Sequence, residues 1–539
     1  MKNGNLSINS ENIFPVIKKW LYSDHDIFVR ELISNGCDAV TKLKKLSLMG
    51  EFDEPDEPYR IDVTTSANDK TITFTDNGIG MTEEEVEKYI NQIAFSGAEA
   101  FLEQYKDKAT EEQIIGHFGL GFYSAFMVAD KVTIETKSYK DGEDAVYWEC
   151  EDGLEYSMKK CIKADRGTTI TLYLNEDSYE FANEYRIKEV IDKYCSFMPV
   201  EIYYTNADEP QEDPKDATVD VDAKEVSDTA DNAEDSKGPD ADDTKTEEKK
   251  PEAPKPLNTT TPLWAKHPND CTDEEYKEFY RKVFHDYKEP LFWIHLNMDY
   301  PFNLKGILYF PKINTQYDNL EGTIKLYNNQ VFVADNIKEV IPEFLMLLKG
   351  CIDCPDLPLN VSRSALQNDG FVKKISDYIT KKVADKLSGM YKTHREDYEK
   401  YWDDINPFIK FGCLKDLKFL DKMKDFCIYK NLAGKYITLP EYLEAGKEKY
   451  ENKVFYVTDE QAQSQYINMF KAEGMDALIM TQTIDSPFIT LLEQKNENVH
   501  FYRIDAELSD NFVGEELSEE TAKEYKDKLT ATFEKALDM

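Results

Sequence analysis

The chain has 539 residues, 105 of them acidic and 65 basic, and its formal net charge at pH 7 is −40. At roughly 150 residues per domain this length predicts three or four domains, and so acidic a composition argues against a nucleic-acid binder, which needs basic side chains to contact phosphates. The polar N-terminus, the lack of any apolar run near the ~20 residues of a membrane span, and nine scattered cysteines together predict a cytoplasmic protein with reduced thiols.

The first informative element is a predicted helix over 26–43. Four polar residues recur in it at spacings of four, three and four, and therefore share one face: Glu31, Asn35, Asp38 and Lys42. The opposite face is apolar. Because Asn and Asp disfavour helix interiors, their presence in mid-helix indicates a face that is turned toward a ligand.

The second element is an alternating strand over 71–75 that ends at Asp76. The turn at 77–80 contains two glycines, and Thr82 with Glu85 forms a capping box that begins the next helix. Asp76 therefore stands at a strand end beside a sharp turn. There its carboxylate can accept hydrogen bonds from an amine.

A Gly-rich segment follows, in which Gly116, Gly119 and Gly121 precede an apolar helical run that reaches Phe126. Main-chain N–H groups at such a helix start can cradle an anion. The segment lacks the Lys-Ser/Thr of a P-loop, and protein-kinase catalytic motifs are absent from the chain. A different kind of phosphate site is therefore expected.

Residues 1–205 mix predicted helices with strand-like runs, which fits an α+β layer with helices on one face of a sheet. The composition then changes. Residues 206–256 contain no aromatic residue, leucine or isoleucine, but 18 acidic and 7 basic residues, so the remainder of the chain carries −29. Such a segment cannot bury enough apolar surface to offset its ordering entropy, and we expect a disordered acidic linker.

Aromatic residues return at Trp264, and strand-like runs alternate with a long predicted helix after Ser364. A smaller mixed segment follows, and the chain ends in an amphipathic helix with a capping start at Ser518. Aromatic side chains such as Trp264, Phe292 and Trp293 fit either a buried core or an exposed apolar patch that binds other proteins. The sequence leaves both alternatives open.

The polar helix, the D-x-G-x-G turn and the Gly-rich segment, in this order, resemble the GHKL ATPase fold. Six stretches resemble the heat-shock protein 90 chaperone family, bacterial HtpG type, and they occur in family order: residues 12–35, the Gly-rich lid, 166–170, 261–266, 300–311 and 356–367. The resemblance implies an ATP-dependent molecular chaperone that remodels client proteins by nucleotide-driven clamp closure, with slow ATP hydrolysis.

The resemblance also implies the domain organisation. An N-terminal GHKL (Bergerat) ATPase sandwich would occupy 1–205, and the acidic linker 206–257. The middle domain would comprise a large part like ribosomal protein S5 domain 2, over 258–400, and a helical and small α/β part, over 401–510. Residues 511–539 would begin a truncated C-terminal dimerisation domain, so we expect a monomer or weak dimer where the full-length family forms homodimers.

The resemblance implies functional roles for residues of both the N-terminal domain and the middle domain. Asp76 would anchor the adenine of ATP, with Thr168 linked through an ordered water, and Asn35 would bind Mg²⁺ through its amide oxygen. Glu31, one turn away, would be the general base. Further nucleotide contacts are implied for Asp38, Lys42, Gly80, Met81, Gly119, Leu120, Gly121 and Phe122. Asp38 and Lys42 could instead satisfy only each other.

Arg363 and Gln367 would reach the γ-phosphate from the middle domain, on one face of a helix, because the planar fork of Arg pairs with phosphate oxygens. Two positions depart from the family pattern. Phe95 stands where many members have a nucleotide-reaching Lys, so no nucleotide role is given to it. His117 stands where Gln is common.

Other functions remain open at this point. The GHKL fold also serves DNA-handling ATPases of the gyrase B or mismatch-repair type, although these need basic surfaces. A histidine kinase should carry a helical phosphoacceptor, whereas His25 lies in a predicted turn. A nucleotide-gated scaffold that does not hydrolyse ATP is a further alternative. For the chaperone we expect client proteins and co-chaperones as partners, and no nucleic acid or membrane.

Overall fold

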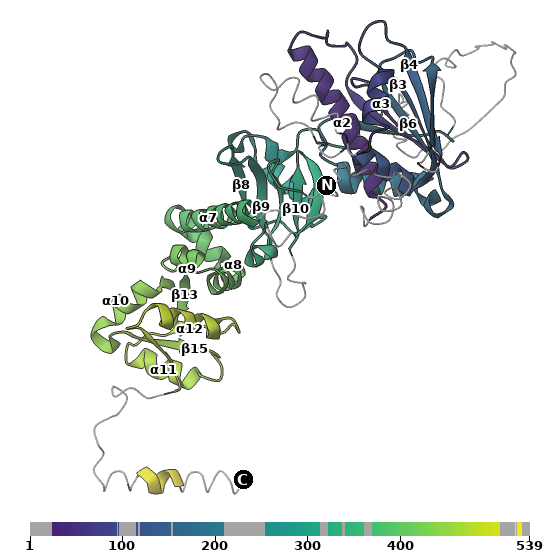
Figure 1. Ribbon diagram of the computed structural model, residues 1–539. Helices are drawn as coiled ribbons and strands as arrows, with labels where there is room; N and C mark the ends of the chain where they lie inside the picture. The colour runs from purple at the N-terminus through teal and green to yellow at the C-terminus, as the bar shows by residue number, and fades with distance from the viewer. Residues whose placement is uncertain are drawn as a thin grey trace, which may run out of the picture.

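The computed structural model describes residues 24–93, 95, 115–116, 119–151, 153, 155–209, 254–312, 322–336, 340–359, 369–506, 523 and 525–530. Three β-sheets follow one another along the molecule in chain order, each with its own helices (Figure 1). In these ranges no helix is both long and apolar enough to cross a membrane.

The first sheet has seven strands in the order β5-β4-β3-β6-β2-β1-β7. Neighbouring strands are antiparallel except β1 and β7, which are parallel. Its strands are β1 (Arg60–Ser66), β2 (Thr71–Asp76), β3 (Ala129–Lys137), β4 (Ala145–Glu151), β5 (Glu155–Cys161), β6 (Gly167–Leu174) and β7 (Glu201–Asn206). Its helices are α2 (Ile27–Leu48), α3 (Glu83–Tyr89), η3 (Gly121–Met127), η4 (Glu176–Ala182) and α5 (Glu184–Cys195). The expected α+β class is confirmed.

Helix α2 lies against this sheet through its apolar side. Phe28 has no exposed surface, and its ring meets the ring of Phe74 edge to face at 6.2 Å. Gly36 allows a close approach, because a Cβ there would lie 3.0 Å from Ile61 Cδ1 and 3.4 Å from Asp76 Cβ. A glycine in mid-helix costs about 1 kcal/mol relative to alanine. Here it brings the end of β2 beside the helix.

Helix α3 begins as the sequence predicts. Glu85 N donates to Thr82 Oγ1 at 3.3 Å, and Thr82 N donates to Glu85 Oε2 at 2.9 Å, so the capping box is confirmed. This fixes the chain direction directly after the turn that follows Asp76.

The second sheet has the strand order β11-β10-β12-β9-β8. Its strands are β8 (Phe292–Met298), β9 (Leu304–Phe310), β10 (Ile324–Asn328), β11 (Val331–Asp335) and β12 (Lys349–Asp353), with helix α6 (Asp273–Phe284) and the short helices η5 (Leu263–Ala265), η6 (Pro268–Asp270) and η7 (Glu343–Leu347). Successive residues of β9 point to opposite faces. Tyr309 packs on Tyr280 of α6 at 5.0 Å, whereas Phe310 packs on Phe408 of the following helices at 5.1 Å.

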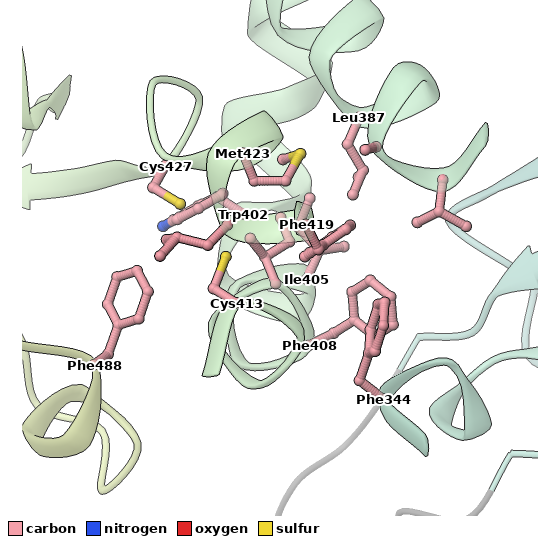
Figure 2. Packing of buried hydrophobic residues seen from close by; sticks show 14 of the residues in the cluster. Phe344, Leu387, Trp402, Ile405, Phe408, Cys413, Phe419, Met423, Cys427 and Phe488 are labelled. Atoms are coloured by element: carbon pink, nitrogen blue, oxygen red, sulfur yellow. The ribbon is translucent and has the colours of Figure 1, made fainter. Parts of the chain in front are cut away.

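The third sheet, ordered β14-β13-β16-β15-β17, joins the second through a helical layer. The layer contains α7 (Asp369–Thr393), α8 (Arg395–Lys415) and α9 (Leu417–Met423); the sheet contains β13 (Ile428–Asn431), β14 (Tyr436–Thr438), β15 (Lys453–Val457), β16 (Leu478–Ile479) and β17 (His500–Arg503), with α10 (Leu439–Tyr450), α11 (Ser464–Ala472) and α12 (Asp485–Lys495). Figure 2 shows Trp402, Phe408 and Cys413 of α8 within the buried cluster of this layer. Residues on both sides of position 400 thus share one core.

The first two sheets also share an apolar core. The Phe197 ring, just after α5, lies 4.7 Å from Trp264, 5.7 Å from Tyr327 and 5.8 Å from Phe279. Trp264 is 1% exposed, and its Nε1 donates to Asp353 Oδ2 at 3.3 Å. Of the two alternatives left open by the sequence, the core is therefore correct for Trp264.

The ends of the expected acidic linker are ordered. Asp208 accepts from Ser66 Oγ at 2.8 Å and from two main-chain N–H groups of the β1–β2 turn. At the other end Leu257 N donates to Ile202 O at 2.8 Å, and the buried Asn258 side chain bonds three main-chain groups at the start of β7. Residues 210–253 lie outside the described residues. The disorder expected over 206–257 therefore does not extend to its two ends.

A buried ion pair joins the helical layer to the third sheet. Lys410 Nζ of α8 lies 2.5 Å from Asp485 Oδ1 of α12, with side chains 6% and 4% exposed. We predict that Lys410→Met destabilises the protein by about 3–5 kcal/mol, because it leaves a buried carboxylate unpaired. Thermal denaturation checks this. Lys447→Met removes an exposed ion pair to Glu444 and should cost less than about 1 kcal/mol. Equal melting temperatures for both variants would contradict the prediction.

Candidate functional site

The polar stripe of α2 faces the Gly-rich segment. Asp38 accepts two main-chain hydrogen bonds, from Ile115 N to Oδ1 and from Gly116 N to Oδ2, both at 2.7 Å. A Cβ on Gly116 would lie 3.8 Å from Asn35 Oδ1, so this amide oxygen also lies close to the segment. Burial lowers the pKa of Lys42, while the neighbouring Asp38 acts in the opposite direction. Asp38 thus holds the start of the Gly-rich segment in addition to its interaction with Lys42.

Glu31 forms a buried ion pair with the residue before it. Arg30 Nε and Nη2 both donate to Glu31 Oε1, at 3.0 and 2.8 Å, and the two side chains are 2% and 6% exposed. The other carboxylate oxygen faces Gly121, where a Cβ would lie 2.6 Å from Glu31 Oε2. A methyl group there would displace the carboxylate or η3. The first residue of η3 and the carboxylate are consequently neighbours.

Arg30 is a residue of the site that the sequence prediction missed. The helical stripe places it off the polar face, so the pattern alone predicts no role for it. A signal did exist, since an arginine among the apolar residues of α2 must find a buried partner.

Asp76 is the last residue of β2 and lies opposite Thr168 of β6 in the strand register. Its Oδ1 accepts from Gly78 N at 2.9 Å. Desolvation raises the pKa of Asp76 to about 7, although the Gly78 hydrogen bond and the positive charge of Lys163 oppose this shift. A carboxyl group with such a pKa changes its charge near neutral pH.

A second missed residue, Thr136 of β3, connects Thr168 with the turn after Asp76. Its Oγ1 lies 3.0 Å from Thr168 Oγ1 and accepts from Met81 N at 2.9 Å. Thr136 is fully buried, and nothing distinguishes it in sequence from the other threonines of these strands. The hydroxyl pair fixes Thr168 and the Met81 main chain beside Asp76.

The two turn glycines at the site have left-handed backbone. Gly80 has φ +63°, and a Cβ there would collide with Lys137 O; Gly119 has φ +62°, and a Cβ there would lie 2.3 Å from Phe95 O. Neither position accepts a side chain. Phe95, which departs from the family pattern, stacks on Tyr89 at 6.0 Å.

Leu120 and Phe122 of the Gly-rich segment differ in the groups that they can offer to a ligand. Leu120 is partly buried, and the Phe122 ring is in the core against Trp148 at 5.9 Å. Phe122 can therefore contribute only main-chain groups to a ligand. Arg363, Gln367 and His117 lie outside the described residues, so their predicted or noted roles are untested.

The donor set fits a magnesium ion that is shared with phosphates. Asn35 and Glu31 are oxygen donors one turn apart on α2, and Mg²⁺ prefers oxygen ligands and retains several waters. No group of three or more His, Cys, Asp or Glu side chains suited to a metal occurs within the described ranges. An ion bound here would accordingly depend on nucleotide oxygens.

Two family models match the chain. The model of histidine kinase-, DNA gyrase B- and HSP90-like ATPases covers residues 22–164 and defines the class of the first domain, and the Hsp90 protein model covers residues 180–539. Because the second match extends far beyond the ATPase domain, it favours Hsp90 over the DNA-handling ATPases. It spans more than half of the chain.

Curated relatives agree over nearly the full chain. The chaperone protein HtpG of Bacteroides fragilis (strain YCH46) is 45% identical over 521 residues, which cover 96% of this chain and 71% of the relative. The HtpG of Bacteroides thetaiotaomicron is 43% identical, covering 100% and 74%, and that of Porphyromonas gingivalis (strain W83) is 43% identical, covering 96% and 71%. The chain belongs to the Hsp90 family, and it is an ATP-dependent molecular chaperone with ATPase activity.

The contact between Gly121 and Glu31 yields a prediction. Gly121→Ala places a methyl group 2.6 Å from Glu31 Oε2, so the carboxylate or η3 must move. Because Glu31 is the expected general base, we predict that ATP hydrolysis falls by roughly ten-fold or more, since a 1 Å misplacement at an active site can cost ~100-fold. Steady-state ATPase measurements check this. Gly389→Ala, in a helix with open space around the added methyl group, should retain parental activity. Parental activity of Gly121→Ala would contradict the prediction.

Proposed function

We propose that this chaperone binds ATP between the polar face of α2, the end of β2 and the Gly-rich segment. The observation that carries the proposal is the contact of α2 with that segment, through Asp38 at Ile115 and Gly116 and through Glu31 at Gly121. Carboxylate and amide oxygens thereby stand beside main-chain N–H groups, which is the combination that a magnesium-bound triphosphate requires.

Asp76 is the proposed adenine anchor. Its ionised carboxylate accepts a hydrogen bond from the exocyclic amine, and Thr168, held by Thr136, provides a hydroxyl for a bridging water. The main chain at Gly80 and Met81 lines the same turn. A buried acceptor of this kind discriminates strongly, because a base without the amine would leave the carboxylate unpaired.

The phosphates are proposed to lie against the main chain of Gly119, Leu120, Gly121 and Phe122, with Lys42 near the same face of α2. Asn35 would hold Mg²⁺, which supplies neutralisation of phosphate charge when bound. The glycines leave room for the backbone to approach the nucleotide closely.

Glu31 is the proposed general base, which orients the attacking water and accepts its proton. Arg30 holds its Oε1, and its Oε2 lies on the side of Gly121. Arg363 and Gln367 of the middle domain are proposed to neutralise the γ-phosphate. Those two roles rest on the family resemblance alone.

Comparison of the parent with Glu31→Ala tests this mechanism. We expect both to bind ATP with similar affinity, and hydrolysis by the variant to fall by roughly 100-fold or more, since general base catalysis contributes ~10²–10⁴-fold. Fluorescence titration and ADP production give the two quantities. Hydrolysis at the parental rate would remove Glu31 from the mechanism, whereas loss of binding would point to a structural role.

The raised pKa of Asp76 predicts a pH-dependent affinity. The amine needs an ionised acceptor, so protonation of Asp76 below about pH 7 should weaken ATP binding by up to roughly ten-fold per pH unit. Asp76→Asn should bind weakly and without this dependence. Because the nucleotide titrates equally in both experiments, the ratio of the two affinities between pH 6 and pH 8 isolates Asp76. A constant ratio would contradict the prediction.

The chaperone acts on client proteins. We propose further that it works in the cytoplasm, with co-chaperones, and through dimers of the family type. We propose that this chain by itself is a monomer or weak dimer. Light scattering with and without nucleotide tests the association, and a tight dimer without nucleotide would overturn that part.

A further inference from the structure

Tyr194, near the end of α5, contacts both the catalytic helix and the second sheet. The Arg30 guanidinium carbon lies 5.8 Å from the centroid of the Tyr194 ring, and the Phe332 ring lies 5.8 Å from it. The hydroxyl group donates to Asp24 Oδ2 at 2.9 Å. Tyr194 is 5% exposed, so water does not screen these contacts.

On the side of the first domain, Tyr194 acts on the partner of Glu31. Arg30 donates two hydrogen bonds to Glu31 Oε1, and its remaining freedom is limited by the aromatic ring beside it. A guanidinium group near an aromatic ring is attracted to the ring face, and more strongly when it is desolvated. Arg30 is 2% exposed. The position of the Tyr194 ring thus influences how Arg30 holds the carboxylate.

On the side of the second sheet, Phe332 of β11 lies between two tyrosines. Its ring is 5.8 Å from Tyr194 and 5.8 Å from Tyr327, with Lys325 Nζ 5.9 Å away. Phe332 is 6% exposed. It belongs to a different sheet from Tyr194, so it contacts Tyr194 only while β11 is docked on α5.

We propose that Tyr194 is a positioning residue for ATP hydrolysis, through which the docking of β11 on α5 sets the orientation of the Glu31 carboxylate. The connected contacts run from Phe332 through Tyr194 and Arg30 to Glu31. The inference rests on the proposed role of Glu31 as general base. It describes regulation of that site by the position of the middle domain, and none of these residues except Glu31 touches the reacting atoms.

The test uses the full chain and measures kcat, KM and ATP affinity. Tyr194→Leu and Phe332→Ala should each lower kcat roughly ten-fold, with KM and affinity within about two-fold of the parent, because the ground-state contacts to ATP are retained. The double variant should be no slower than the slower single variant, since both changes interrupt one path. Tyr194→Phe keeps the ring and loses only the hydroxyl group, which bonds Asp24 and interacts with Lys193, so it should hydrolyse ATP like the parent.

Tyr185→Leu is the matched control, a tyrosine of the same helix that is 84% exposed, and it should be unchanged. Three results would each overturn the proposal. They are a parental kcat of Tyr194→Leu, an equal loss of kcat and ATP affinity in that variant, and a kcat of Tyr194→Phe well below that of the parent. Glu31→Ala in the same series separates the positioning role of Tyr194 from the general-base role of Glu31. If Glu31→Ala is inactive while Tyr194→Leu is normal, only the positioning role fails; if Glu31→Ala is fully active, the base assignment itself fails.

Discussion

The site depends on one interaction, in which the Asp38 carboxylate accepts hydrogen bonds from two consecutive main-chain N–H groups of the Gly-rich segment. Hydrogen bonds to an ionised acceptor are roughly twice as strong as neutral ones. Since Asp38 shares one helical face with Glu31 and Asn35, attachment of the segment at this point also sets where Gly121 meets Glu31. A single carboxylate therefore aligns α2 with the main chain that is proposed to bind phosphates.

The second constraint is the apolar core that the first two sheets share. Phe197 of the first domain inserts among Trp264, Phe279 and Tyr327, and Tyr194 meets Phe332. A separation of these sheets would expose large aromatic surfaces to water, which is costly. The ATPase domain and the second sheet therefore have a preferred arrangement. A chaperone cycle that changes this arrangement must compensate with contacts elsewhere.

Much of the first domain could be predicted from its sequence, because the signals there are local. The polar stripe of α2, the strand ending at Asp76 and the capping box at Thr82 each follow from the spacing of a few residues. Arg30 and Thr136 could not be predicted in the same way. Their partners become neighbours only when the helix phase and the strand register are known. The roles of Arg363 and Gln367 depend on family resemblance.

The acidic stretch, 206–256, contains a feature that average composition does not predict. Average composition predicts a segment without apolar anchors, but Asp208 and Asn258 each make three hydrogen bonds to strands of the first sheet or to the residues beside them. Single polar residues with several main-chain partners do not change an average. They nevertheless attach the described ends of the segment to the first domain.

These two attachments have a consequence for the path of the chain. Both attachments lie beside the same strand, β7, one just after its end and the other at its start. The chain therefore returns to the first domain before it enters the second sheet. The distance between the first two sheets is consequently held by the Phe197 contacts, and the number of residues between the two attachments does not set it.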